Sequence, residues 1–133
     1  MAALTTDLST PRRLGLQYVH PLAAAVKAWS GGIAVLDEQG NVRPAITATG
    51  LTACGVFQET KDNLLGAAGA KSIRVEKGVF GFLTDATLNR TLIGKTVYLI
   101  DDQTVAATDG GGMRSPAGVL DDFDGTTAWI RFA

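Results

Sequence analysis

The chain has 133 residues, of which 46% are hydrophobic and 19% are charged, so one domain with one hydrophobic core is expected. Its 12 basic and 13 acidic residues leave a net charge of -1, which argues against nucleic acid or an anionic membrane as a partner. A single cysteine excludes an intrachain disulfide, and neither a secretory signal nor a bilayer-spanning apolar run is present, so we expect synthesis in the cytoplasm.

The first 19 residues show neither helical nor alternating periodicity and predict an extended N-terminal arm. Leu14, Leu16 and Tyr18 alternate in a way that suits a strand added to a neighbouring subunit, although a frayed terminus is the alternative. The contact residues expected in this arm are Thr10, Pro11, Arg12, Arg13, Leu14, Leu16 and Tyr18.

Residues 20–133 predict a β-rich domain, because turn residues recur roughly every 8 to 12 positions between short apolar or alternating segments. Asp85 is expected to cap one helical turn that contains Leu88 and Leu92. The fold class is therefore all-β or mainly β: a single small antiparallel β-barrel or sandwich with an extended N-terminal arm and at most one short helix. Strands are expected within residues 22–29, 33–36, 51–58, 72–76, 79–83, 96–100, 104–107, 117–120 and 126–132.

Alternation within these strands predicts which side chains are buried. Ile73 and Val75 should share one buried face, and so should Ala128, Ile130 and Phe132. A second pair of alternating aromatics, at positions 80 and 82, could form a nucleic-acid platform, but Gly81 between them favours a closely packed core face.

No residue pattern predicts catalysis, so we expect no enzyme activity. The GKT triplet at residues 94–96 resembles the end of a phosphate-binding loop, but Asn89 stands where that motif needs glycine, and a strand rather than a helix follows. The single His20 lies at the junction of arm and domain, where it is a poor candidate for a catalytic base. Cys54 lies in an apolar stretch and is expected to be a small buried hydrophobe.

Paired aspartates at 101–102 and at 121, 122 and 124 could bind Ca²⁺ or act as acid and base. Each group ends a strand and opens a turn, where aspartate commonly accepts hydrogen bonds from nearby backbone N–H groups. We therefore expect turn residues, with no metal and no cofactor. Because residues 101–125 hold six Asp against one Arg, the loops at Asp109 and Asp121 are further contact candidates.

Short stretches in order along nearly the whole chain carry one family resemblance. They are MAALT at 1–5, TPRR at 10–13, GLTA at 50–53, DN at 62–63, GAAG at 66–69, GVF at 78–80, IGKTVY at 93–98, DDQTVA at 101–106, RS at 114–115, AGV at 117–119 and WI at 129–130. In this order they resemble the small capsid cement, or head-decoration, proteins of Mu-like and related tailed phages and prophages. Leu64 and Leu65 depart from the family pattern, in which a smaller and more polar pair is expected.

The resemblance implies a virion structural protein that binds the outer surface of the capsid and stabilises contacts between major capsid protein subunits. It also implies a homotrimer, or a dimer, on the capsid exterior, made in the cytoplasm of the host bacterium, with no cofactor. A different function remains open: a β-barrel module that binds a small molecule or carbohydrate. Its site would be lined by Trp29, Trp129 or Tyr98.

Overall fold

A computed structural model describes residues 2–133 of the chain, and it confirms the all-β prediction. Its only helical element is the 3₁₀ turn η1, Arg90–Leu92, so none of the described residues forms a helix of the length and apolarity needed to cross a membrane. The strands are β1 Gln17–Pro21, β2 Val26–Ala28, β3 Ile33–Leu36, β4 Val42–Pro44, β5 Thr52–Phe57, β6 Lys61–Asn63, β7 Ser72–Glu76, β8 Gly78–Thr84, β9 Thr96–Leu99, β10 Thr104–Ala106, β11 Pro116–Phe123 and β12 Ala128–Phe132.

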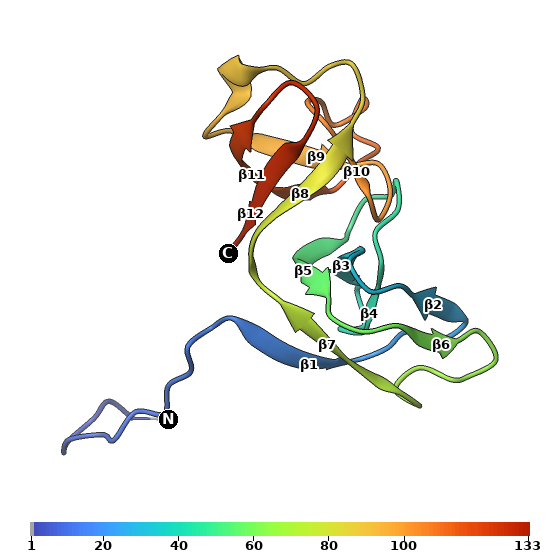
Figure 1. Ribbon diagram of the computed structural model, residues 1–133. Helices are drawn as coiled ribbons and strands as arrows, with labels where there is room; N and C mark the ends of the chain where they lie inside the picture. Colours follow the sequence, from blue (N-terminus) through green and yellow to red (C-terminus); the bar gives the residue numbers. More distant parts are fainter. Residues whose placement is uncertain (1) are drawn as a thin grey trace.

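The strands form an open sheet and a closed barrel (Figure 1). The five-stranded sheet has the order β1-β7-β5-β3-β4 and is antiparallel throughout, and β2 and β6 form a separate two-stranded ribbon beside it. The barrel has the order β10-β8-β12-β11-β9, and β8 and β10 pair in parallel while its other neighbours are antiparallel. The chain passes from sheet to barrel through Lys77, and Gly78, the first residue of β8, has a φ of +145°.

The prediction of a single core is wrong, because the buried side chains form two clusters. The barrel cluster fills the barrel and reaches one face of the five-stranded sheet, and the sheet cluster lies on the opposite face, under β2. Consecutive strand residues point to opposite faces, so β5 gives Val56 to the barrel cluster and Phe57 to the sheet cluster. Ala34 and Val35 of β3 divide in the same way.

The predicted strand faces are confirmed. Ile73 and Val75 are fully buried in β7, and β12 alternates between buried and exposed residues from Ala128 to Phe132.

The aromatic pair of β8 also lies on a core face. Phe82 meets the ring of Phe132 edge-on with 6.0 Å between ring centroids, and Phe80 lies 6.4 Å from the same ring. A Cβ placed on Gly81 would lie 2.6 Å from the methyl group of Thr127, so the close packing predicted at this glycine is confirmed.

The predicted helical turn begins later than expected. Asp85 Oδ1 accepts a hydrogen bond from the Thr87 N–H at 3.0 Å, but no helical residues follow it directly. The cap of η1 is Asn89, whose Oδ1 accepts a hydrogen bond from the Thr91 N–H at 2.9 Å. Asp85 and Asn89 each form the same type of side-chain turn, but helical backbone follows only Asn89.

Candidate functional site

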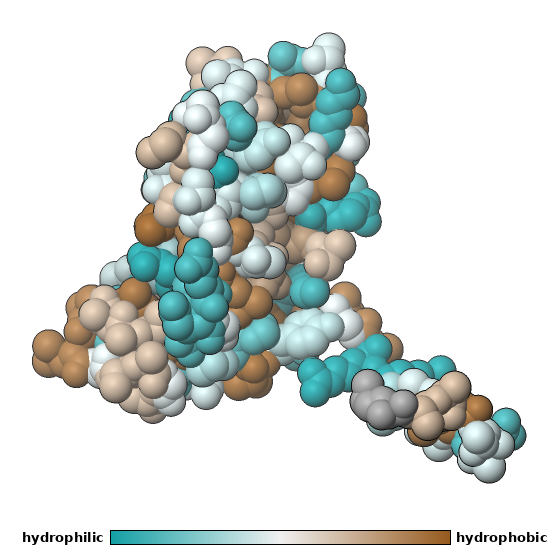
Figure 2. Space-filling view, turned by 180° about the vertical axis from the view of Figure 1, so that it is seen from behind, coloured by the Kyte–Doolittle hydropathy of each residue, from teal (hydrophilic) through white to brown (hydrophobic). Residues whose placement is uncertain are grey.

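The N-terminal arm projects away from the body of the molecule (Figures 1 and 2). No residue from 2 to 16 belongs to a strand or helix, and the arm carries four exposed leucines: Leu4, Leu8, Leu14 and Leu16, the third of which is 95% exposed. Leu16 is the anchor, because its carbonyl accepts a hydrogen bond from the Lys77 N–H at 2.7 Å. Met1, the first residue of the predicted arm, lies outside the described residues.

The structure separates the predicted arm contacts into two groups. Thr10, Pro11, Arg12, Arg13 and Leu14 are exposed in the arm. Residues 17–19, which the sequence pattern assigns to the arm, instead belong to β1, where Tyr18 pairs with Val75 of the same chain. The interpretation of Tyr18 as part of a strand for a neighbour is therefore corrected. The physical reason is that β7 would otherwise leave an open edge beside its buried side chains, and β1 satisfies that edge within the chain.

Tyr18 lies at the centre of a small cluster of cationic and aromatic side chains. Lys77 Nζ lies 5.1 Å and the Arg13 guanidinium 5.9 Å from the centroid of its ring, and the His20 ring stacks at 6.1 Å. Partial burial, and then the charge of Lys77, lower the pKa of His20 below its ordinary value. The cluster therefore favours the neutral form of the imidazole.

The lowered pKa of His20 predicts a pH-dependent stability. Because the folded state binds a proton on His20 less well than the unfolded state does, the contribution of neutral His20 should be present above about pH 6.5 and lost as the pH falls through the folded pKa. We expect Tm to fall more between pH 7.5 and pH 5 for the native protein than for His20→Gln, which cannot titrate. Equal slopes of Tm against pH for the two proteins would rule out this role of His20.

Asp109 organises the loop that contains Gly110, Gly111 and Gly112. Its carboxylate accepts a hydrogen bond from the Gly111 N–H at 3.1 Å, and its carbonyl accepts from the N–H groups of Met113 and Arg114. Glycines 110, 111 and 112 all have φ between +63° and +86°, the left-handed region in which glycine is favoured. The loop is a hydrogen-bonded turn with an exposed tip.

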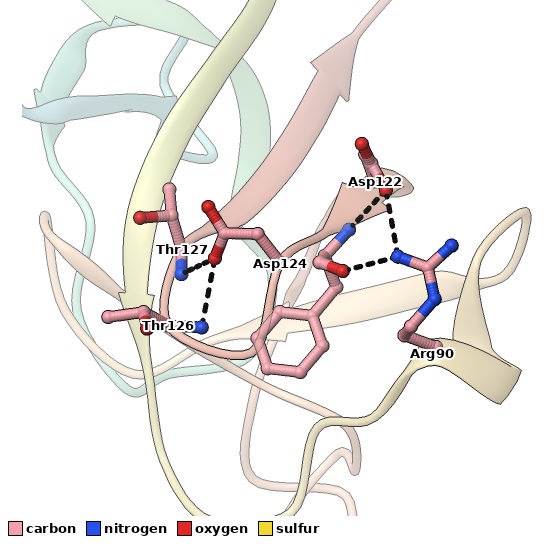
Figure 3. A network of polar contacts seen from close by, with 6 residues as sticks. Arg90, Asp122, Asp124, Thr126 and Thr127 are labelled. Atoms are coloured by element: carbon pink, nitrogen blue, oxygen red, sulfur yellow. Dashed lines mark hydrogen bonds and ion pairs between the residues drawn. The ribbon is translucent and has the colours of Figure 1, made fainter.

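The aspartates near the end of β11 are held by contacts within the chain (Figure 3). Asp121 forms an ion pair with Arg131 of β12, and Asp122 Oδ1 lies 3.3 Å from Arg90 Nη1. Asp124 Oδ1 accepts hydrogen bonds from the N–H groups of Thr127 at 2.7 Å and Thr126 at 2.9 Å, which lower its pKa. Asp101 Oδ1 likewise accepts from the Gln103 N–H at 2.9 Å.

The bonds of Asp101 and Asp124 confirm the interpretation of these two as turn residues, whereas Asp121 and Asp122 lie within β11 and pair with arginine side chains, so the interpretation is wrong for them. Within residues 2–133 no three His, Cys, Asp or Glu side chains lie close enough together to hold a metal ion. Asp109 lies on the loop after β10 and Asp121 lies within β11, and neither is brought together with the arm by any contact that the structure records.

Cys54 is the buried hydrophobe that the sequence predicts. It is 6% exposed, burial raises the pKa of its thiol to about 12, and its Sγ lies 3.4 Å from the Ala34 carbonyl. A thiol with such a pKa is a poor nucleophile at neutral pH.

The three aromatic residues considered for a ligand site do not meet. Trp29 lies over Lys27 Nζ at 4.1 Å and lines a depression of about 330 Å³ together with Asp102 and Gln103. Burial, and then the charge of Asp101, raise the pKa of Asp102 there. Trp129 and Tyr98 do not line this depression, because they belong to the barrel strands β12 and β9.

Two exposed features of the molecule were not predicted from the sequence. One is the exposed pair Leu64 and Leu65 after β6, the second of which is fully exposed. The other is the outer edge of β1, which no described strand covers. The departure of the two leucines from the family pattern could have pointed to the first, and no sequence signal points to the second.

Comparison with known proteins leaves the family of the chain open: no protein-family model matches it, and neither the curated proteins nor the solved structures contain a significant match.

Proposed function

We propose that the protein is a capsid cement protein of a tailed phage, which binds the outer surface of the capsid and stabilises contacts between major capsid protein subunits. The observation that supports this most directly is the arm of residues 2–16, which carries exposed leucines away from a rigid all-β body. The ordered sequence resemblance to cement proteins is the second support.

The arm suits a bridging function for simple geometric reasons. At about 3.3 Å per residue, residues 2–16 can extend to roughly 50 Å, more than a small β domain alone would reach across a subunit boundary. Each leucine that becomes buried on a capsid subunit contributes about 1.5–3 kcal/mol. Ordering the arm on the capsid costs conformational entropy that offsets part of this gain, and many copies on one shell act together.

The proposal includes assembly and location. The protein acts as a homotrimer on the capsid exterior, with a dimer as the alternative, after synthesis in the cytoplasm of the host bacterium. Its direct partners are the major capsid protein and further copies of itself.

Removal of residues 2–14 is expected to abolish binding to capsids assembled from the major capsid protein of the same phage. The truncation keeps Gly15 and Leu16, so the hydrogen bond from Lys77 and the whole of β1 are retained. Co-sedimentation with purified capsids measures binding, and circular dichroism checks that the truncated protein is folded.

A matched pair of full-length variants separates side-chain contacts from chain length. Leu4→Ser with Leu8→Ser should weaken co-sedimentation at least about tenfold, because two leucine contacts are lost. Thr5→Ser with Thr6→Ser changes the same part of the arm without removing a large apolar group and should bind like the native protein. Undiminished capsid binding by the truncated protein would overturn the role of the arm.

A further inference from the structure

The outer edge of β1 has unpaired backbone groups at alternate residues. The pairing of β1 with β7 runs in constant register from Gln17 opposite Glu76 to Pro21 opposite Ser72. Just outside this range, the Lys77 N–H donates to the Leu16 carbonyl at 2.7 Å, and the Leu22 N–H donates to the Lys71 carbonyl at 2.9 Å.

These two flanking bonds determine the direction of the groups between them. In an antiparallel pair, residues that exchange hydrogen bonds with the partner alternate with residues whose N–H and C=O point away from it. Leu16 and Leu22 exchange bonds with β7, so Tyr18 and His20 do so as well. The N–H and C=O groups of Gln17 and Val19 therefore point outward, where no described strand pairs with them.

The edge is short and only partly protected. Pro21 ends it, because proline has no N–H to offer, and Gly15 turns the chain away before it with a φ of +81°. Val19 remains 65% exposed at its centre. Figure 1 shows β1 at the margin of the five-stranded sheet, with no strand drawn on its outer side.

A depression of about 440 Å³ follows this edge. It is lined by Arg13, Gln17, Tyr18, Val19 and Arg74. Gln17 and Val19 point to one face of β1, and Arg74 lies opposite Val19 in the pairing with β7, so the depression lies on the face that these three residues share, next to the strand edge. Its charged groups are two arginines, and no carboxylate lines it.

Arg13 is more available than Arg74 to bind a negatively charged group. Arg74 Nε lies 3.5 Å from Glu59, whereas none of the ion pairs among the described residues involves Arg13. An extended segment with acidic side chains would pair its backbone with Gln17 and Val19 and its charges with the arginines.

We propose that the outer edge of β1 is a docking site for an extended acidic segment of a partner protein, which adds as a sixth strand to the sheet. This inference does not depend on which protein supplies the segment, and its site includes Arg13 of the arm.

Amide hydrogen exchange measured by NMR tests the edge directly. In the free protein, the Tyr18 and His20 amides should be protected, and the Gln17 and Val19 amides should exchange rapidly. A ten-residue peptide in which valine alternates with glutamate should slow exchange at Gln17 and Val19 at least about tenfold, and the same peptide with lysine in place of glutamate should bind at least about tenfold more weakly.

Variants of Val19 separate the backbone from the side chain. Val19→Pro removes the outward N–H and leaves the bonds to β7, so it should weaken binding of the glutamate peptide at least about tenfold with little change in Tm. Val19→Thr keeps the N–H and should bind like the native protein. If Val19→Pro does not fold, the exchange measurement on the native protein still decides.

Three outcomes would overturn the proposal. The first is rapid exchange at Val19 in the presence of millimolar glutamate peptide. The second is equal affinity for the glutamate and lysine peptides, which would show that the partner segment does not need to be acidic. The third is a protected Val19 amide in the free protein together with a doubled mass by light scattering, which would assign the edge to a second copy.

Discussion

Replacement of Gly55 by alanine is expected to destabilise the protein by about 3 kcal/mol or more. Gly55 lies in β5, the central strand of the five-stranded sheet, and has a φ of +140°. A Cβ at this position would lie 2.3 Å from the carbonyl oxygen of Glu76 and 2.9 Å from Cγ1 of Val75. The oxygen belongs to the backbone of β7, so it cannot move aside without displacing the strand.

A matched substitution isolates the steric contribution. Gly40 also has a positive φ, +80°, but a Cβ there would meet nothing within 4 Å, so Gly40→Ala should cost only about 1 kcal/mol of backbone strain. Urea unfolding of the two variants measures the difference in free energy of unfolding. Equal costs for Gly55→Ala and Gly40→Ala would show that close strand contact at β5 is not the cause.

Replacement of Phe57 by alanine should lower the free energy of unfolding by about 3–5 kcal/mol and still leave one unfolding transition. The side chain is 1% exposed and belongs to the sheet cluster, so truncation opens a cavity there. The adjacent Val56 packs in the barrel cluster on the other face of the same strand. Because β5 contributes to both clusters, loss of one should destabilise the other, and the two should unfold together.

Two further variants test this coupling. Ile130→Ala removes a fully buried side chain from the barrel cluster. It should lower the free energy of unfolding by about 2–5 kcal/mol, again in a single transition. Val79→Ala removes a side chain that is 39% exposed and should cost less than about 1 kcal/mol. Calorimetry that resolved two transitions in Phe57→Ala would contradict the coupling through β5.

The turn chemistry could be predicted from the sequence because it is local. An aspartate that follows a strand accepts N–H groups two or three residues ahead, as Asp101 and Asp124 do, and no distant residue is needed. The burial of Ile73 and Val75 was equally predictable, since strand side chains alternate between faces. The candidate site was less predictable, because an arm without periodicity shows only that no element is expected there.

Local pattern alone therefore determined the all-β class, most strand positions, the buried face of each alternating strand and the arm with its exposed leucines. Only the tertiary structure decided that Tyr18 pairs with Val75, that β3 and β5 divide their side chains between two clusters, and that β1 keeps an open edge beside Arg13. The physical reason is that alternation specifies the faces of a strand and carries no information about its partner. Partners are chosen by packing and hydrogen bonding between residues far apart in the chain, such as positions 18 and 75.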